Sequence, residues 1–488
     1  MTETLISDRQ IGVAFNSIPP KHKPHIVMIV PRGEAVRNFL YSDTLRILSE
    51  NARVTLLSVI DDERFLSRFR PFVEQIIPLP YFQERRMVTA LRSILHETHF
   101  RWLDSKVARN EWQSRDAKAK TPAQKLKRNV QKVPIQLLAH RTILELLTEV
   151  ERDLSCRFPP TNYFDALFDK LNPDLVFNCS HIHGPAGELP AKIAYFTRKK
   201  TAGFIFSWDN LTSRSRIFVP YHFYLVWHNK MREQLLQIYP KISSDQVFVT
   251  GTPQFDFHFK SDLFLTREEL CQRIGIDSHR PFILYTTGIA KHFPDEHRTV
   301  EFIINLLQTM DIDPKPQLVV RTYAKGTSPE MKNLAARQIP DVVFPPVLWE
   351  EKWFTPLYED LAIYTNLLRH CSLGINAAST VSLELLMHNK PVINLGFDPP
   401  GSHLPEHLHW SRHIEFDHYK PVAESGAVMV ARLIEDLGDM IAEGLIESNT
   451  GCESRHPFIQ DMLGNFFDGN SGRRVAEQLV TLAETRSR

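Results

Sequence analysis

Short apolar runs alternate with amphipathic stretches along this chain. The runs at residues 25–31, 54–59 and 174–178 are largely apolar. This is typical of strands in a parallel sheet, because helices cover both faces of such a sheet. Between them, residues 36–49 and 134–154 carry apolar positions at helical spacing. The pattern predicts βαβ units, in which amphipathic helices connect parallel strands.

The same rhythm restarts in the second half of the chain. Residues 281–286 and 317–321 are apolar runs separated by an amphipathic stretch at 299–310. Residues 373–398 follow with a short strand, a small-residue turn, a helix and a second strand. The Gly-Thr-Pro sequence at 251–253 breaks regular structure between the halves. A restart after such a break predicts a second α/β domain.

These patterns predict two Rossmann-like parallel-sheet domains whose strand-end loops face a central cleft. A length of 488 residues supports two domains, because single hydrophobic cores rarely grow that large. The first domain is expected at 1–255 and the second at 256–470. Residues 471–488 are expected to form an amphipathic helix that crosses back onto the first domain.

Composition narrows the class of protein. A net charge of +1 argues against a nucleic-acid binder, which usually carries a basic excess. The five cysteines lack CxxC spacing, so neither a zinc site nor a disulfide framework is indicated, and a cytoplasmic setting is expected. The N-terminus lacks a signal-peptide pattern, and no apolar window is long enough for a membrane span.

A basic helical insertion of the first domain is expected at about 101–155. Residues 101–132 hold ten Lys or Arg against three acids and show no strand pattern. One interpretation is a solvated helical surface. The other is a basic face that docks on anionic lipid, at the inner face of the membrane, or on an acidic acceptor, with Trp102 and Trp112 as interfacial anchors.

The small-residue turn before the last predicted helix indicates an anion site. Ala378, Ser379 and Thr380 precede a helix whose first backbone N–H groups lack intrahelical partners and carry the positive dipole end. Small side chains let an anion approach these groups closely. The stretch therefore predicts a diphosphate site.

Polar residues follow other predicted strands. His181 and His183 come after the strand at 174–178, and Asp209 lies in a turn-prone run after another strand. Ligands gather at the carboxyl ends of parallel strands, and histidine titrates near neutral pH. The histidines are therefore candidates for chemistry, with a structural role as the alternative. Asp209 is expected either to close its strand in an Asx turn or to bind the acceptor.

The second half offers further strand-end groups and a histidine-rich segment. Gly288, Lys291 and His292 follow the strand at 281–286, and Arg321 ends the strand at 317–321. The segment after residue 402 contains His403, His407, His409 and His413. A metal site would need convergent ligands, so polar surface is the expected role of that segment and no metal is expected.

Three segments resemble a known family. Residues 376–384 with 390–393 resemble its donor-binding signature, 207–213 resembles a segment of its first domain, and 249–256 resembles its interdomain V-x-G-x-P-x-x-D stretch. The family is that of GT-B transferases of bacterial surface-carbohydrate assembly, including CDP-glycerol glycerophosphotransferases and capsule glycosyltransferases. The resemblance covers about 175–398, and residues 1–174 carry no signature of it.

The resemblance implies a role for each candidate. The second domain binds a nucleotide-sugar donor through Ser379, Thr380 and Glu384. Glu384 suits the ribose hydroxyls, with a glutamate on a helix surface as its alternative. Lys291 and Arg321 neutralise the leaving diphosphate in place of a metal, so no cofactor is expected, although Arg321 has a salt-bridged strand end as its alternative. The acceptor, a glycan or a lipid-linked sugar, binds to the first domain.

The proton acceptor for the acceptor hydroxyl is expected to be His183 or His181, with Asp209 second and His292 third. His292 also suits the phosphate site because it lies beside Lys291.

Glycosyl transfer is the function that the sequence favours. Polyol-phosphate transfer from a CDP-linked donor needs the same diphosphate site and stays open. A non-hydrolysing UDP-sugar 2-epimerase shares the fold, but epimerases of that type have glycine and paired carboxylates in the turn where this chain has Ala378-Ser379-Thr380, and only Glu384 remains nearby. A non-catalytic carbohydrate-binding protein is the remaining alternative.

Overall fold

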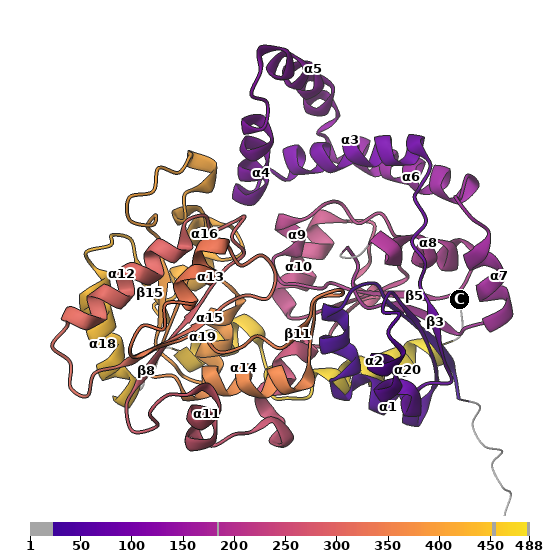
Figure 1. The fold of residues 1–488 in the computed structure, drawn as a ribbon. Coiled ribbons are helices and arrows are strands. Elements are labelled where there is room, and N and C mark those ends of the chain that lie inside the picture. The colour runs from indigo at the N-terminus through magenta and orange to yellow at the C-terminus, as the bar shows by residue number, and fades with distance from the viewer. Residues whose placement is uncertain (1–22, 183–184, 451–454, 486–488) are drawn as a thin grey trace, which may run out of the picture.

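Two parallel sheets organise the computed structural model, which describes residues 23–182, 185–450 and 455–485 (Figure 1). The first sheet has the strand order β3-β2-β1-β4-β5-β6-β7 and the second has β10-β9-β8-β13-β14-β15. In both, the strand that opens the domain is central and the chain winds outward to either side. The prediction of two Rossmann-like parallel-sheet domains is confirmed, and this is the GT-B type of architecture.

The first sheet is built on a fully buried strand. All six residues of β1 are buried, and β1 pairs in parallel with β2 through Ile26 and Val54 and with β4 through Ile26 and Leu175. This burial explains the continuous apolar run at the start of the chain. The strands are β1 (His25–Val30), β2 (Arg53–Ser58), β3 (Gln75–Pro78), β4 (Leu175–Asn178), β5 (Thr201–Phe204), β6 (Phe223–Val226) and β7 (Val247–Val249).

The second sheet repeats this arrangement around β8. Each of its five residues is buried, and β8 lies between β9 and β13. A short antiparallel hairpin of β11 and β12 stands outside the sheet. The strands are β8 (Phe282–Thr286), β9 (Gln317–Arg321), β10 (Val342–Val343), β11 (Trp349–Glu350), β12 (Thr355–Pro356), β13 (Leu373–Asn376), β14 (Val392–Leu395) and β15 (Met429–Ala431).

Helices cover both sheets (Figure 1). Those of the first domain are α1 (Asp43–Asn51), α2 (Glu63–Leu66), α3 (Arg86–Leu103), α4 (Lys106–Ala117), α5 (Pro122–Leu138), α6 (Arg141–Arg157), α7 (Tyr163–Leu171), α8 (Glu188–Phe196), α9 (Asn210–Ser213) and α10 (Asn229–Ile238). Those that follow are α11 (Arg267–Ile274), α12 (Glu296–Thr309), α13 (Pro329–Ala335), α14 (Tyr358–His370), α15 (Thr380–Met387), α16 (Ser411–Glu415), α17 (Lys420–Ala423), α18 (Leu437–Thr450), α19 (Arg455–Leu463) and α20 (Ser471–Glu484).

Short turns of tighter or wider helix complete the elements. They are η1 (Val36–Leu40), η2 (Ser67–Phe72), η3 (Pro185–Gly187), η4 (Ser244–Gln246), η5 (Pro253–Phe259), η6 (Ser261–Leu263) and η7 (Glu406–Leu408).

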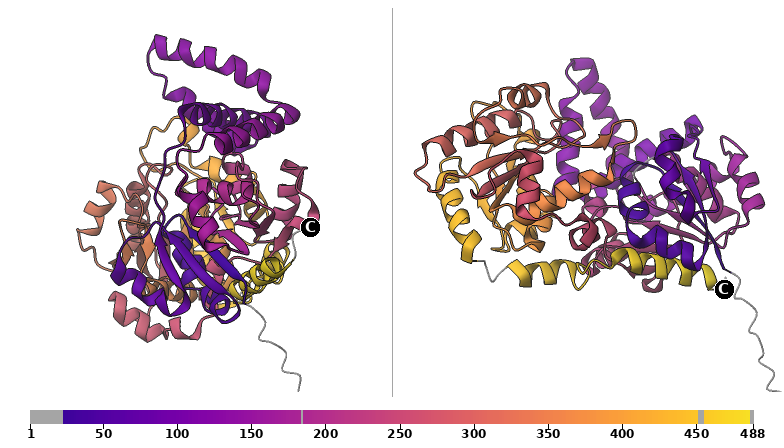
Figure 2. Two further views of the ribbon diagram at one scale, coloured as in Figure 1. Left: turned by 90° about the vertical axis from the view of Figure 1, so that its right-hand side faces the viewer. Right: turned by 60° about the horizontal axis from the view of Figure 1, so that its bottom comes forward.

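Helices α3 to α6 form the insertion in the chain between β3 and β4. They stand above the first domain and the junction, with α5 farthest out (Figures 1 and 2). The helical run begins at Arg86, before the basic stretch. Composition marks the basic part of the insertion, whereas α3 begins in sequence of ordinary charge.

The last helix, α20, lies against the first domain and is capped at both ends. Asp256 accepts hydrogen bonds from the backbone N–H groups of Ser471 at 3.0 Å and Gly472 at 2.6 Å. At the other end, Lys200 donates to the carbonyl oxygens of Leu482 and Ala483 at 2.9 and 2.6 Å. These contacts place a negative group at the helix N-terminus and a cation at its C-terminus, as the helix dipole favours.

Candidate active site at the junction of the two domains

The loops at the carboxyl ends of the two sheets meet at a junction between the domains. Trp208, which follows β5, donates its indole N–H to the hydroxyl of Thr380, which opens α15, at 3.0 Å. Gly33, which follows β1, lies so close to Trp353 of the β11–β12 loop that a Cβ atom would stand 2.0 Å from its carbonyl oxygen. The strand-end groups of both domains therefore share one region.

The turn before α15 is shaped by Asn376. Its side-chain oxygen accepts from the backbone N–H of Ser379 at 3.1 Å and from the hydroxyl of Ser382 at 3.2 Å. Ala378 has φ of +54°, a left-handed conformation that non-glycine residues rarely adopt and that marks a constrained turn. Within the described chain no acceptor contacts the backbone N–H groups of Thr380 and Val381. Two donors of the predicted anion site are thus available.

Glu384 lies inside the protein instead of on a helix surface. One carboxylate oxygen accepts from the hydroxyl of Tyr364 at 2.5 Å, and the other lies 3.2 Å from Nε2 of His258. His258 in turn contacts His388 at 3.0 Å. Burial, followed by the charge of Glu384, raises the pKa of Tyr364 well above its ordinary value, so this phenol stays protonated and donates. The carboxylate is therefore held in one orientation.

Arg321 ends β9 in a buried ion pair. Its Nη2 atom lies 2.6 Å from each carboxylate oxygen of Asp360, and Nη1 donates to the carbonyl of Pro346 at 2.8 Å. Both side chains are at least 94% buried, with exposures of 6% and 2%. The structure thus shows the salt-bridged strand end that the sequence left as the alternative. Its role toward a donor stays a prediction.

In the loop after β8, fewer polar groups are available to a ligand than the sequence predicts. The backbone N–H of Gly288 donates to Glu296 at 3.0 Å, and the ring of Phe293 fills the space beside this glycine. Burial raises the pKa of Glu296 to about 8, so it is largely protonated at neutral pH. The side chain of Lys291 is exposed and remains available to an anion.

His292 is held at the junction through its backbone. Arg412 donates to its carbonyl oxygen at 2.6 Å. Burial, then the positive charges of Lys291, Arg412 and Arg214, lower the pKa of His292. The imidazole is therefore neutral at pH 7.

His181 is buried below the junction. Its Nδ1 atom accepts from the backbone N–H of Phe206 at 3.3 Å, and the residue is 3% exposed. Burial lowers the pKa of His181 to about 3, which makes its imidazole a weak base. This environment suits a structural histidine better than a proton acceptor. His183 lies outside the described residues, and its predicted role stays a prediction.

Asp209 holds a carboxylate in the loop that follows β5. It accepts from the hydroxyls of Ser207 and Ser213 and from the amide of Asn210 at 3.3 Å. Burial alone would raise its pKa, but His418, the two hydroxyls and Arg214 together lower it. The carboxylate is thus ionised at neutral pH. Among the ion pairs of the described residues, none joins Asp209 to a cation.

His418 faces Asp209 from the second domain, and the sequence analysis did not single it out. Its ring lies edge-on to that of Trp208, with centroids 5.3 Å apart, and its Nδ1 atom is buried without a hydrogen-bond partner among the described residues. Burial lowers the pKa of His418 and the charge of Asp209 opposes this effect. The nearest signal was the histidine-rich segment that precedes it, whose four histidines were interpreted only as metal ligands or polar surface.

The histidines of that segment have separate surroundings. His413 packs on the ring of Phe293 at 4.3 Å, and His409 contacts the carbonyl of Leu404 at 2.9 Å. Over the residues that the structure describes, no three His, Cys, Asp or Glu side chains gather as a metal site.

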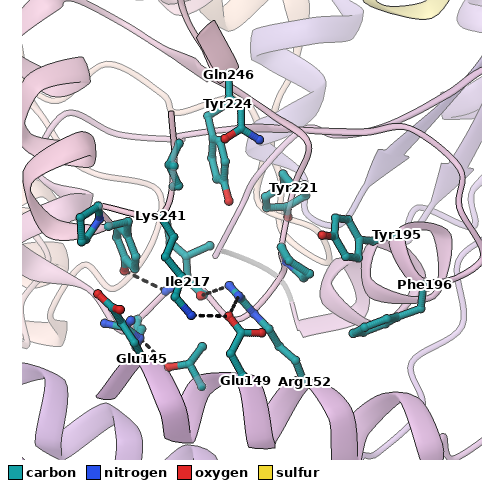
Figure 3. A pocket seen from close by; sticks show the side chains of 16 residues that line it. Glu145, Glu149, Arg152, Tyr195, Phe196, Ile217, Tyr221, Tyr224, Lys241 and Gln246 are labelled. Atoms are coloured by element: carbon teal, nitrogen blue, oxygen red, sulfur yellow. Dashed lines mark hydrogen bonds and ion pairs between the residues drawn. The ribbon is translucent and has the colours of Figure 1, made fainter. Parts of the chain in front are cut away.

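A separate cavity of about 250 Å³ lies at the amino ends of β5, β6 and β7, away from the junction (Figure 3). Several polar groups that line this cavity form hydrogen bonds with one another. Arg152 donates to Glu149 at 3.0 Å, and the hydroxyl of Tyr239 accepts from the backbone N–H of Ile217 at 2.9 Å. None of the predicted site residues lines it. The junction remains the candidate site because ligands of parallel sheets bind at the carboxyl ends of strands.

Comparisons with known proteins support the fold. No protein-family model matches the sequence, and no curated protein matches it. Solved structures do match over nearly their whole length. One titled UDP-N-acetylglucosamine 2-epimerase has a TM-score of 0.50 and 13% identity, covering 96% of this chain and 98% of its own.

Two further structures agree. The S. aureus MnaA–UDP co-structure has a TM-score of 0.51 at 12% identity, with 93% and 96% of the two chains covered. The UDP-GlcNAc 2-epimerase of Methanocaldococcus jannaschii has a TM-score of 0.50 at 12% identity, with 94% and 99% covered. At such identities the likeness establishes the two-domain fold alone.

None of the helices in the described part of the chain combines the length and the apolar character that a bilayer span requires.

Proposed function

We propose that this protein is a metal-independent glycosyltransferase. It moves a sugar from a nucleotide-sugar donor to a glycan or lipid-linked acceptor in bacterial surface-polysaccharide assembly, at the inner face of the membrane. The support comes from the junction, where a helix start with free N–H donors meets one unpaired carboxylate from the other domain.

The partners of the carboxylates at the junction distinguish between transfer and epimerisation. Glu34 is paired with Arg32, Asp360 with Arg321, and Glu384 is held by Tyr364 and His258. Asp209 alone among these is held by neutral hydroxyl and amide donors. Transfer needs one proton acceptor, whereas epimerisation removes and returns a proton on opposite faces of the sugar. A single junction carboxylate outside any ion pair therefore favours transfer over epimerisation.

The second domain supplies the donor half. The backbone N–H groups of Thr380 and Val381 suit the diphosphate, and the exposed ammonium group of Lys291 suits the charge that develops as the diphosphate leaves. Glu384, held by two donors, retains lone pairs for the ribose hydroxyls.

The first domain supplies the base. The acceptor hydroxyl attacks the anomeric carbon, the bond from that carbon to the diphosphate oxygen breaks, and the hydroxyl proton passes to Asp209. The imidazole of His418 lies near enough to Asp209 for each group to shift the pKa of the other, so it can hydrogen-bond to the protonated carboxyl. The reaction releases a nucleoside diphosphate.

Two other reactions use the same fold. Polyol-phosphate transfer from a CDP-linked donor would release a nucleoside monophosphate instead. The titles of the matching structures name UDP-sugar epimerases, which makes 2-epimerisation of a UDP-sugar the second reaction to test. The three reactions differ in their products, so they are separable by experiment.

A thermal-shift screen of nucleotides and nucleotide sugars tests the donor site. UDP is the first to try because it is the ligand of one matching structure. A nucleoside diphosphate that binds the native protein at 100 times its Kd should stabilise it by about 2.7 kcal/mol. Glu384→Gln should weaken this response, since it removes the ribose acceptor charge, and Glu301→Gln on α12 is the matched control. No response to any nucleotide would refute the proposal.

A further inference from the structure

Helix α5 presents its apolar side chains to solvent. Leu126, Val130, Val133 and Leu137 recur at helical spacing and are 67%, 64%, 57% and 74% exposed. On an ordinary surface helix such a stripe faces the core. This apolar stripe is therefore a surface that the rest of the described chain leaves uncovered.

The opposite side of α5 carries charge toward the protein. Arg128, only 8% exposed, pairs with Glu97 of α3 and with Asp116 of α4, the latter at 2.9 Å. Lys132 pairs with Asp116 at 2.5 Å. On this helix, basic side chains face the protein and the apolar stripe faces solvent, which is the reverse of an ordinary surface helix. The ion pairs with α3 and α4 determine which face is exposed.

The tryptophans are not the anchors that the sequence analysis expected. Trp112 lies beneath the cations of α5, with Arg128 4.8 Å from its ring centroid. Trp102 lies against Arg141 and the ring of His99. Both are engaged within the insertion, and the exposed apolar surface belongs to α5.

The charged side chains of the segment that carries the apolar stripe are all basic. Residues 117–138 contain no acidic side chain, and Lys118, Lys120, Lys125 and Lys127 are exposed. A second copy of this helix would bring like charges together, whereas an anionic bilayer complements them. An apolar face flanked by lysines is the pattern of helices that lie in a membrane interface.

We propose that α5 docks on an anionic lipid bilayer, with the apolar stripe in the acyl boundary and the four lysines on the lipid headgroups. A helix of 17 residues extends about 25 Å along the surface at 1.5 Å per residue. Docking through this helix does not depend on the chemistry at the junction.

The insertion also contacts both domains at the junction. At the start of α4, the backbone N–H of Lys106 donates to Asp417 at 2.6 Å and its ammonium group to Glu415 at 2.8 Å. Ser105 donates to the carbonyl of Thr212, in the helix that follows Asp209, at 3.0 Å. Helix α4 therefore joins the insertion that carries α5 directly to loops of both domains at the junction.

Co-sedimentation of the full chain with vesicles tests the docking. Wild type should bind vesicles of phosphatidylcholine with phosphatidylglycerol, and bind pure phosphatidylcholine at least 10-fold less. Replacing the four stripe residues, Leu126, Val130, Val133 and Leu137, by Gln should reduce binding to the anionic vesicles at least 10-fold. Lys125→Gln with Lys127→Gln should reduce it and weaken its dependence on salt.

A matched control uses exposed apolar residues elsewhere. Leu433 and Ile446, 61% and 69% exposed in the second domain, should tolerate the same replacement by Gln without loss of vesicle binding. Circular dichroism should be unchanged in every variant, because the replaced side chains are on the surface. Equal vesicle binding by wild type and the four-fold variant would overturn the proposal. So would a wild-type dimer in sedimentation velocity that the four-fold variant converts to monomer.

Discussion

Asp209 is the residue on which the proposed chemistry depends. Its carboxylate is ionised at neutral pH and is held by Ser207, Ser213 and Asn210, so replacement by an isosteric amide should leave the fold intact. Asp209→Asn should lower transfer by at least 100-fold, the order of general-base contributions, while donor binding stays within a few-fold. Initial rates and calorimetry measure the two quantities. Asp153→Asn, at an exposed carboxylate of α6 that pairs with Arg157, is the control, and a wild-type rate in Asp209→Asn would assign the base elsewhere.

Glu296 gives the protein a predictable dependence on pH. Burial raises its pKa from 4.5 to about 8, so the folded state holds a proton that the unfolded state releases between these values. The contribution of this group to stability is fully present below pH 4.5 and is lost as the pH rises toward 8, at about 1.4 kcal/mol per pH unit. Glu296→Gln should therefore lose less thermal stability than wild type between pH 5 and pH 8.

The control for this experiment lies on the same helix. Glu301 pairs with Arg337 near the surface, and Glu301→Gln should follow the wild-type pH profile. Parallel profiles for wild type and Glu296→Gln would show that the carboxyl ionises freely in the folded protein.

At the residue scale, the sequence located strand-end groups but not their partners. The positions of Asp209 and Thr380 follow from short-range patterns, because each comes directly after a buried strand. The pairing of Arg321 with Asp360, the burial of Glu384 and the approach of His418 to Asp209 depend on contacts between segments far apart in the chain. Local periodicity carries no information on such contacts.

At the scale of elements, Gly33 controls how closely the loops of the two domains approach. A Cβ atom at Gly33 would stand 2.0 Å from the carbonyl oxygen of Trp353 and 2.1 Å from the hydroxyl of Thr355. Gly33→Ala should force the junction apart, lower transfer at least 10-fold and increase the radius of gyration in X-ray scattering. Gly438→Ala, where the nearest side-chain atom is 3.6 Å away, should change neither. An unchanged scattering profile and transfer rate in Gly33→Ala would show that the β11–β12 loop moves to accommodate the added methyl group.

The strands were the most predictable elements. Continuous apolar runs predicted β1, β2, β4, β8 and β9 within a few residues, because burial on both faces leaves a plain signal. The insertion was less predictable. Its composition identified a basic helical segment, but the outward apolar stripe of α5 follows from ion pairs with α3 and α4, which sequence spacing does not reveal.

At the scale of the whole molecule, contacts across the junction hold one arrangement of the domains. Trp208 donates to Thr380, Lys352 pairs with Asp61 at 2.7 Å, and Lys106 pairs with Glu415 at 2.8 Å. The exposed ion pairs contribute little to stability, since solvent and salt screen their attraction. The hydrogen bond from Trp208 therefore matters more, because it joins the proposed base loop directly to the proposed diphosphate turn.

Product identity tests the central claim most directly. The protein is incubated with a labelled nucleotide sugar that stabilises it, with and without an oligosaccharide or lipid-linked acceptor, and the nucleotide products are separated. The account predicts that nucleoside diphosphate accumulates only when the acceptor is present, and that Asp209→Asn stops its release. Conversion of the donor to its C2 epimer without an acceptor, or release of a nucleoside monophosphate from a CDP-linked donor, would contradict it.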